Sequence, residues 1–301
     1  MKSEQTIKHG AVCTAPVGLA VLAGRILAGA VALLLISGAF SAAWAITGGQ
    51  PDTNNIYSNV GAVVFAPPGS VPNPRFSGTL IHPRVFLTAA HTVVRFEENH
   101  PAPFTDCYVT FVPDVRYPDK SISREIEAVI DHPDYQPNGY DPHRNDVGVI
   151  ILKEPICDLP LAKLAEEGFL DELRADGLLR KPGQGRASFT VVGYGSTLDW
   201  PPPEETPGDG PRRFAQTEFL ALRETWLHTA QNLATGSGGT GFGDSGGPTF
   251  WVNNDGSLVL VAVTPGGNLR LIGQNIPWRV DIPETLDFID WVINTALPTL
   301  P

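Results

Sequence analysis

Cysteine is scarce in this chain, and the residue clusters that hold structural metals are missing. Only three cysteines occur in 301 residues, and none forms a Cys-x-x-Cys pair or belongs to a His/Cys cluster. Structural metal sites are built from such closely spaced ligands, so we expect no metal and no cofactor. His132 and His143 flank a loop rich in Pro, Asp and Tyr, where a solvated rim is favoured over a metal site.

Positive charge is also in deficit. The 21 Lys and Arg residues are outnumbered by 32 Asp and Glu residues, which gives a formal net charge of −11. Proteins that bind nucleic acids present basic surfaces to the phosphates, so the composition argues against nucleic acid as a partner.

Long apolar runs are missing after residue 45, whereas the first 45 residues contain one. Residues 26–40 are fifteen positions without a charge, and residues 43–45 read Ala-Trp-Ala, the small-x-small pattern of a signal-peptidase site. We predict that residues 1–45 are a signal peptide and that the protein is secreted or periplasmic. An uncleaved anchor stays open as the alternative, because residues 26–45 are about long enough to span a bilayer. Only a protein with the uncleaved anchor would have a membrane as a partner.

Export also bears on the cysteines. Cys13 lies in the predicted leader, which leaves Cys107 and Cys157 in the mature chain. An exported chain can oxidise such a pair, so a disulfide between them is expected. Two separate buried thiols are the alternative, since the sequence does not place their Cα atoms within bonding distance.

From Ile46 onward, short apolar runs alternate with turn residues, and the chain contains 31 glycines and 28 prolines. This pattern favours short strands over long helices. The first set of predicted strands covers residues 60–65, 78–81, 85–88, 108–112 and 147–152. The second set covers residues 188–192, 217–222, 258–263 and 278–280. Two groups of strands predict two β units with a site between them.

Three further segments depart from the strand pattern. Residues 161–179 carry leucines at helical spacing, which predicts a short surface helix. Pro283 is placed to begin a second helix that continues to Ile293. Residues 199–213 are rich in Pro, Gly and charge, which is typical of an exposed loop.

Three short motifs carry residues suited to nucleophilic catalysis, in the order His, Asp, Ser. Residues 88–91 read Thr-Ala-Ala-His, Asp146 precedes an apolar strand, and residues 243–248 read Gly-Asp-Ser-Gly-Gly-Pro. A serine hydroxyl attacks well only when a base removes its proton. His91 can be that base, and Asp146 can orient its ring. Each motif alone has an ordinary explanation as a turn or loop, but their joint order favours a triad with Ser245.

The segment from Gly243 to Gly247 also fits the Gly-x-Ser-x-Gly elbow of α/β-hydrolases. In those enzymes the acid and then the histidine follow the serine. No histidine follows Ser245 in this chain, so that class is excluded.

Together, these motifs resemble those of the trypsin/chymotrypsin-like serine peptidase family. The matching segments are residues 46–49, 77–81, 88–91, 145–150, 191–195 and 243–248. Residues 231–239 look more like those of bacterial exported members than those of animal digestive ones. The resemblance implies an all-β fold, with two six-stranded antiparallel β-barrels, a C-terminal α-helix and an active site in the cleft between the barrels. It implies barrel domains at 46–155 and 156–301.

The resemblance also implies an activity. Members of this family hydrolyse peptide bonds through a Ser-His-Asp triad and an acyl-enzyme, so we expect an exported serine endopeptidase. Its partners would be polypeptide substrates and protein inhibitors. The alternative is a catalytically weak or inactive binding protein on the same scaffold, because one fold can serve unrelated functions.

Two more features of the catalytic centre follow from the resemblance. The backbone N–H groups of Gly243 and Ser245 would form the oxyanion hole. Ile46, directly after the predicted leader, would place its terminal ammonium beside Asp244 as an activation salt bridge. A short propeptide that is cut elsewhere is the alternative.

The substrate pocket implied by the resemblance has Gly239 at its base and Thr264 and Gly266 along its wall. A trypsin-like enzyme carries an acid at the base, and Gly239 supplies none. We therefore expect a small or medium apolar residue before the scissile bond.

The family's usual cysteines are missing around the predicted site. Thr92 and Phe76 stand at one pair of these positions, and Gly241 stands at a third. Loss of each cross-link would cost a few kcal/mol unless packing compensates.

Overall fold

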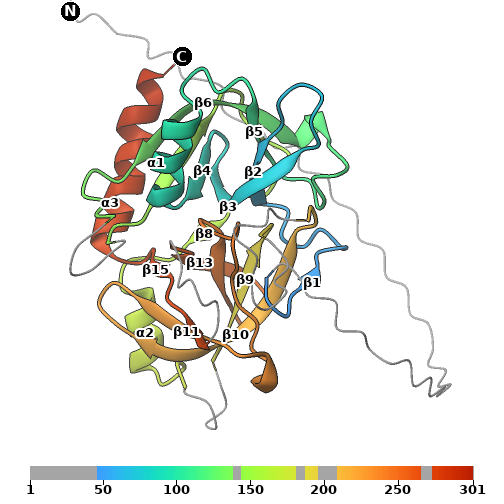
Figure 1. Ribbon diagram of the computed structural model, residues 1–301. Helices are drawn as coiled ribbons and strands as arrows, with labels where there is room; N and C mark the ends of the chain where they lie inside the picture. The colour runs from blue at the N-terminus through green and yellow to red at the C-terminus, as the bar shows by residue number, and fades with distance from the viewer. Residues whose placement is uncertain (1–45, 138–143, 181–186, 196–208, 266–272, 301) are drawn as a thin grey trace, which may run out of the picture. The chain divides into compact units, whose positions relative to one another are not determined.

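Six strands of the N-terminal half close into a barrel in the order β2-β3-β4-β7-β6-β5, with every pairing antiparallel (Figure 1). The strands are β2 (Val60–Phe65), β3 (Asn73–His82), β4 (Val85–Thr88), β5 (Cys107–Thr110), β6 (Ser123–Asp131) and β7 (Gly148–Leu152). One apolar cluster draws side chains from all six strands and fills the barrel; its members include Val63, Leu80, Phe86, Val109, Ile126 and Ile150.

This computed structural model describes residues 46–137, 144–180, 187–195, 209–265 and 273–300. All of them lie within one compact unit, Ala43–Pro301. Among these residues, no helix combines the length and the apolar character needed to cross a membrane.

The second sheet follows the order β14-β11-β10-β9-β12-β13-β15. These strands are β9 (Ser188–Gly193), β10 (Arg213–Leu222), β11 (Leu227–Gln231), β12 (Pro248–Val252), β13 (Leu258–Val263), β14 (Gly273–Asn275) and β15 (Trp278–Arg279). Two short strands join at the side: β1 (Gln50–Pro51) pairs with β10, and β8 (Lys163–Leu164) runs parallel to β13.

Hydrogen bonds also link the start of β11 to the segment around β15, which brings the two sides of the second sheet together. The Leu227 N–H donates to the Pro277 carbonyl at 3.0 Å, and the Arg279 N–H donates to the Thr225 carbonyl at 3.0 Å. Pro277 has no N–H to donate, and it separates β14 from β15. The predicted all-β double barrel with a C-terminal helix is confirmed. The predicted division of the chain at residue 155 stays a prediction.

A second apolar cluster joins the two barrels. It combines Val60 and Val64 of β2 with Phe250, Leu260 and Trp278 of the second sheet. Successive residues of a strand face opposite sides, so β2 contributes both to its own barrel and to this shared core.

A buried ion pair ties the segments around the shared core together. The Arg212 guanidinium lies 3.0 Å from the Asp52 carboxylate, and both side chains are fully buried. Arg212 also donates to the carbonyls of Val60 and Phe111, at 2.9 and 3.1 Å. A buried pair with these extra hydrogen bonds holds Arg212 against the first barrel.

In the described part of the chain, three α-helices lie outside the barrels: α1 (Ala90–Asn99), α2 (Phe169–Ala175) and α3 (Pro283–Trp291). The short 3-10 helices are η1 (Lys120–Ile122), η2 (Leu233–Thr235) and η4 (Leu297–Thr299), and the π-helical segment η3 (Val292–Ala296) follows α3 directly. The predicted helix start at Pro283 is confirmed, as expected for a proline in a first helical turn. Phe288 and Ile289 turn their buried face to the shared core.

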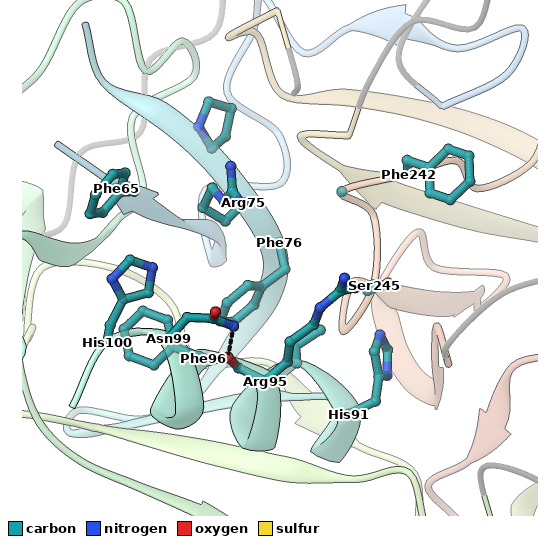
Figure 2. Close-up of a pocket in the computed structure, with 13 residues that line it drawn as sticks. Phe65, Arg75, Phe76, His91, Arg95, Phe96, Asn99, His100, Phe242 and Ser245 are labelled. Carbon is teal, nitrogen blue, oxygen red and sulfur yellow. Dashed lines mark hydrogen bonds between the residues drawn. The ribbon is translucent and has the colours of Figure 1, made fainter. Parts of the chain in front are cut away.

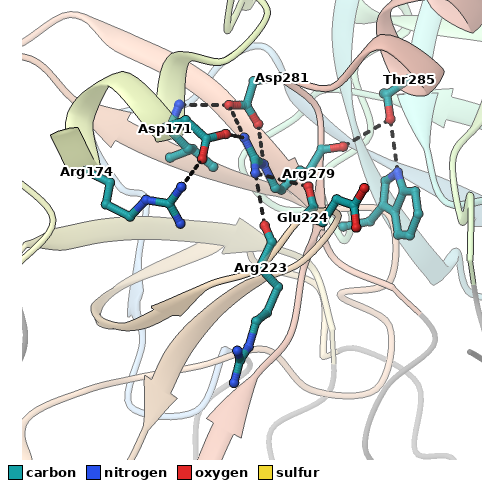
Figure 3. A network of polar contacts seen from close by, with 9 residues as sticks. Asp171, Arg174, Arg223, Glu224, Arg279, Asp281 and Thr285 are labelled. Carbon is teal, nitrogen blue, oxygen red and sulfur yellow. Dashed lines mark hydrogen bonds and ion pairs between the residues drawn. The ribbon is translucent and has the colours of Figure 1, made fainter.

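The predicted helix over 161–179 is wrong for most of its length. Lys163 and Leu164 form β8, and the helical part is only α2. Arg279 anchors α2 to the second sheet, since its guanidinium donates to Asp171 at 2.6 Å and to Asp281 at 2.9 Å (Figure 3). Most of the predicted loop at 199–213 lies outside the described residues, and β10 begins at Arg213.

The predicted disulfide between Cys107 and Cys157 is wrong, because Cys107 is a free, buried thiol. It lies in β5 among the apolar residues that fill the first barrel, including Phe76 and Phe104. Burial raises the pKa of the Cys107 thiol to about 11, so the thiol stays protonated at neutral pH.

Candidate active site

His91 lies in the first turn of α1, where backbone N–H groups have no partner within the helix. The residue before the helix, Ala89, has no side chain that could cap it. The Asp146 carboxylate takes that place, because its Oδ1 accepts the backbone N–H of His91 at 2.8 Å. Its Oδ2 lies 2.8 Å from Nδ1 of the same histidine. Asp146 is fully buried, and the His91 side chain is 18% exposed. The carboxylate therefore fixes both the backbone and the ring of His91.

A tight turn before β7 presents Asp146 to this helix. Asn145 has a φ of +56°, in the left-handed region that asparagine tolerates better than most residues. Its side-chain amide donates to the Asp134 carbonyl at 3.0 Å. The Val147 N–H closes the turn on the Asn145 carbonyl at 2.7 Å. The Asn-Asp motif thus forms the turn through Asn145 and positions the carboxylate of Asp146 through that turn.

Ser245 lies in a turn that only glycine-rich sequence can form. Gly243 has a φ of +89°, and a Cβ there would lie 2.8 Å from the Gly195 Cα. Gly246 has a φ of +79°, and a Cβ there would lie 1.9 Å from the Thr88 hydroxyl. Both glycines are needed because any larger residue would strain the backbone and collide with its neighbours.

Ser77 of β3, in the first barrel, forms two hydrogen bonds with this turn. Its N–H donates to the Ser245 carbonyl at 2.9 Å, and its hydroxyl donates to the Gly243 carbonyl at 3.0 Å. The same hydroxyl accepts the Tyr194 N–H at 2.9 Å. In the sequence, Ser77 belongs to the matching segment 77–81, but nothing there indicates its contact with the nucleophile turn.

One pocket of about 500 Å³ is lined by both His91 and Ser245 (Figure 2). His91 comes from α1 beside the first barrel, Ser245 from the turn before β12, and Asp146 from the turn before β7. The structure therefore brings all three residues of the predicted triad to one place.

Asp244, directly before Ser245, is a fully buried carboxylate. Its two oxygens accept the N–H groups of Gly195 and Gly241, each at 2.8 Å, and the backbone N–H of Ile46 also donates to it. Burial raises the pKa of Asp244 to about 7, although these hydrogen bonds and nearby Arg213 lower it in part. Ile46 is itself buried. Ile46 and Asp244 therefore lie side by side in the uncleaved chain, and the activation salt bridge between them stays a prediction.

The predicted substrate pocket is described in part. The Thr264 backbone pairs with the nucleophile turn, since its N–H donates to the Gly247 carbonyl at 2.9 Å. A Cβ on Gly239 would lie 2.4 Å from the Gln231 side chain and 2.8 Å from the Asn275 amide nitrogen. Gln231 and Asn275 are thus neighbours of the predicted pocket base that the sequence gave no reason to choose. Gly266 lies outside the described residues.

Packing and hydrogen bonds occupy the places of the missing cysteines. The Thr92 hydroxyl donates to the Ala89 carbonyl at 2.6 Å, and Phe76 packs edge-on against Phe96 with ring centroids 5.9 Å apart. The Gly241 N–H holds the Asp244 carboxylate.

His132 itself is buried, whereas the loop residues that follow it, 133–137, are exposed or half-buried. Its Nε2 lies 3.1 Å from the Glu284 carbonyl at the start of α3, and its ring packs against Phe288 with centroids 5.0 Å apart. His143 lies outside the described residues. No cluster of three His, Cys, Asp or Glu side chains that could hold a metal is found in the part of the chain that is described.

Comparison with known proteins agrees with this geometry. The trypsin family model matches residues 70–292, which is most of the chain. No curated protein matches the sequence. Among solved structures, a mutant of human heparin binding protein (CAP37) is similar, with a TM-score of 0.57 and 19% sequence identity. That match covers 82% of this chain and 96% of the other, and at this identity it speaks for the fold alone. The family match over residues that include His91, Asp146 and Ser245 shows that the chain belongs to the trypsin family.

Proposed function

We propose that the mature protein is an exported serine endopeptidase that works through His91, Asp146 and Ser245. The observation that carries this proposal is the double contact of Asp146 with His91, in a pocket that Ser245 also lines. A binding protein has no need for a buried carboxylate that fixes one tautomer of a histidine beside a serine. Membership of the trypsin family supports the proposal that the protein is secreted or periplasmic. If the leader is not cleaved, it would anchor the protein to the membrane.

The proposed reaction begins with proton transfer. Because Nδ1 of His91 is held by Asp146, Nε2 is the nitrogen left to accept a proton from Ser245. The serine Oγ attacks the substrate carbonyl carbon, and the carbonyl oxygen becomes an oxyanion. His91 then gives its proton to the leaving nitrogen, the C–N bond breaks, and an acyl ester remains on Ser245. Water, activated by the same imidazole, hydrolyses the ester.

The proposed oxyanion donors are the N–H groups of Gly243 and Ser245. The positive φ of Gly243 turns its peptide away from ordinary strand geometry, and Ser77 holds its carbonyl. A donor fixed in advance stabilises the charge that develops in the transition state, and loss of one such donor costs on the order of 3 kcal/mol.

We propose that removal of the leader before Ile46 also completes the site. In the uncleaved chain Ile46 has a φ of +53°, a region that β-branched residues avoid. This torsion involves the bond to residue 45, so cleavage there abolishes it. Cleavage also creates an ammonium where an amide now meets Asp244, and opposite charge favours the ionised carboxylate. Amino-terminal sequencing of the active, secreted protein should give Ile46 as the first residue; a start several residues earlier contradicts the proposal.

The proposed preference before the scissile bond is for a small or medium apolar residue. Gln231 and Asn275 stand where a side chain on Gly239 would extend, and neither carries a charge that would attract Lys or Arg. Thr264 and Gly266 are proposed to pair with the substrate backbone. Fastest turnover of Arg or Lys substrates would contradict this preference. Partners of the site would be polypeptide substrates and protein inhibitors.

A peptide library tests the proposed function directly. The mature chain starting at Ile46 should cleave internal bonds of a subset of peptides, and Ser245→Ala should cleave none. Equal cleavage by both proteins would trace the activity to a contaminant, and failure of the mature chain to cleave any peptide would favour the binding protein on the same scaffold.

A further inference from the structure

The pocket that His91 and Ser245 share extends well beyond these two residues, along one face of α1 (Figure 2). Its described lining is Phe65, Pro74, Arg75, Phe76, His91, Thr92, Arg95, Phe96, Asn99, His100, Phe242, Gly243 and Ser245. The triad uses only a corner of this space, so most of the lining has no role in the reaction proposed above.

Aromatic rings line much of this space. Phe76 and Phe96 are buried, and their rings meet edge to face. His100 packs against both Phe96 and Phe65, with ring centroids 5.3 and 4.6 Å apart. Such a surface can cover the aliphatic part of a bound side chain and exclude water from it.

Two arginines add positive charge to the aromatic lining. Arg75 and Arg95 are both exposed, and none of the described lining residues is acidic. Glu97 and Glu98 follow Arg95 on α1 but do not line the pocket. A cationic cleft stands out in a chain of net charge −11, because clefts lined by one sign of charge concentrate ligands of the other sign.

The position of His91 indicates which part of a substrate enters this pocket. In the proposed reaction, the imidazole gives its proton to the leaving nitrogen, and His91 itself lines the pocket. The predicted subsite for the acyl side, around Gly239 and Thr264, belongs instead to segments of the second barrel. The residues after the scissile bond therefore run over α1 and β3.

Helix geometry gives the distance between Arg95 and His91 along α1. It follows His91 by four residues, which places both on the same face of α1, about 6 Å apart along the axis. Two residues of an extended peptide span about the same distance. Figure 2 shows the Arg95 side chain extending from α1 toward Ser245. A peptide lying along α1 thus brings its second leaving-group residue to this guanidinium.

We propose that the pocket selects substrates with a carboxylate on the second residue after the scissile bond. Arg75 and Arg95 would bind that carboxylate, and the aromatic lining would cover the carbon chain that carries it. The carboxylate can belong to an Asp or Glu side chain, or to the C-terminus of a peptide that ends there. This proposal rests on the proposed function, because it names the substrate class of the same site.

Matched peptides test the proposal. A peptide cleaved in the library is remade with Gln, Glu or Lys at the second position after the cleaved bond, each with an amidated C-terminus. A fourth peptide ends at that position with Gln and a free carboxylate. We expect kcat/KM to be about tenfold higher for Glu than for Gln, and lower for Lys than for Gln. The fourth peptide tells a terminal carboxylate from a side-chain carboxylate.

Substitution of the arginines assigns the effect. In Arg75→Gln combined with Arg95→Gln, the ratio of kcat/KM for the Glu peptide to that for the Gln peptide should fall to about twofold or less. Arg174→Gln, which removes an exposed arginine of α2, is the matched control and should keep the full preference. Cleavage of the Gln peptide without a preference for Glu overturns this proposal alone, as does a preference that survives the double substitution. Failure to cleave any peptide contradicts the proposed function as well.

Discussion

The buried carboxylate of Asp244 should make the uncleaved chain lose stability as the pH rises, and cleavage before Ile46 should remove that loss. Burial raises the pKa of Asp244 from its ordinary 3.8 to about 7 in the folded, uncleaved chain. The unfolded chain therefore releases this proton at a lower pH than the folded chain does. A difference of this size corresponds to about 4 kcal/mol of folding free energy once the pH exceeds 7.

The sign of the effect follows from which state holds the proton. Below about pH 4 both states are protonated, so Asp244 contributes nothing. Between about pH 4 and pH 7 the unfolded state is ionised and the folded state is not, so the free energy of unfolding falls as pH rises. From about pH 5 to about pH 7.5 the loss amounts to about 2–3 kcal/mol. An ammonium at Ile46 lowers the pKa of Asp244 and thereby reduces this loss.

Urea unfolding of two proteins measures the effect. Both carry Ser245→Ala to prevent self-cleavage; one keeps residues before Ile46 and the other begins at Ile46. Between about pH 5 and about pH 7.5 the longer protein should lose about 2–3 kcal/mol more than the shorter one. Asp244→Asn in each should abolish the difference. An equal pH dependence in both proteins would refute the reasoning about Ile46 and Asp244.

Three substitutions test other parts of the structure. Asp52→Ala leaves Arg212 buried without its carboxylate and should lower the free energy of unfolding by about 3–5 kcal/mol, measured by urea titration. Ser77→Ala leaves the Gly243 carbonyl and a second buried group without partners, which should cost about 2–6 kcal/mol and also lower kcat. Asp146→Asn would favour the wrong tautomer of the histidine and should lower kcat by about 10⁴-fold at neutral pH.

Matched substitutions at positions more accessible to solvent serve as controls. Asp114→Ala breaks an ion pair with the exposed Arg116 and should cost about 1 kcal/mol or less. Ser188→Ala removes an exposed serine hydroxyl and should cost less than about 0.5 kcal/mol. Burial is expected to make Asp52→Ala cost more free energy of unfolding than Asp114→Ala, and Ser77→Ala more than Ser188→Ala. Equal losses within either pair would contradict this expectation. A loss of less than about tenfold in kcat for Asp146→Asn would contradict its orienting role.

The strands that sequence predicted best are those whose apolar runs are buried on both faces. The predicted bounds 60–65, 85–88 and 258–263 coincide with β2, β4 and β13. β6 was missed because charged residues interrupt its apolar pattern and most of its residues are only half-buried. The helix over 161–179 was overextended because its leucines fit a helix locally, whereas pairing with β13 makes Lys163 and Leu164 a strand.

In the candidate site too, residues that lie in local motifs were predicted from the sequence, whereas roles that depend on contacts in the folded chain were not. His91, Asp146 and Ser245 lie in local motifs, and their side chains are of the types that serve as base, orienting carboxylate and nucleophile. α1 was missed, because its residues include two adjacent valines and no capping side chain precedes it. Without that helix, nothing in the sequence connects Arg95 with the nucleophile. The role of Ser77 likewise depends on a contact between residues 166 positions apart, which only the folded chain reveals.

Covalent labelling of Ser245 tests the central claim most directly. The mature chain is treated with a fluorophosphonate, and the adduct is located by mass spectrometry of peptides. We predict one adduct, on Ser245, whose formation slows strongly in His91→Ala. An intact, folded protein beginning at Ile46 that takes up no label, or that takes it up on another residue at an equal rate in Ser245→Ala, would contradict the account.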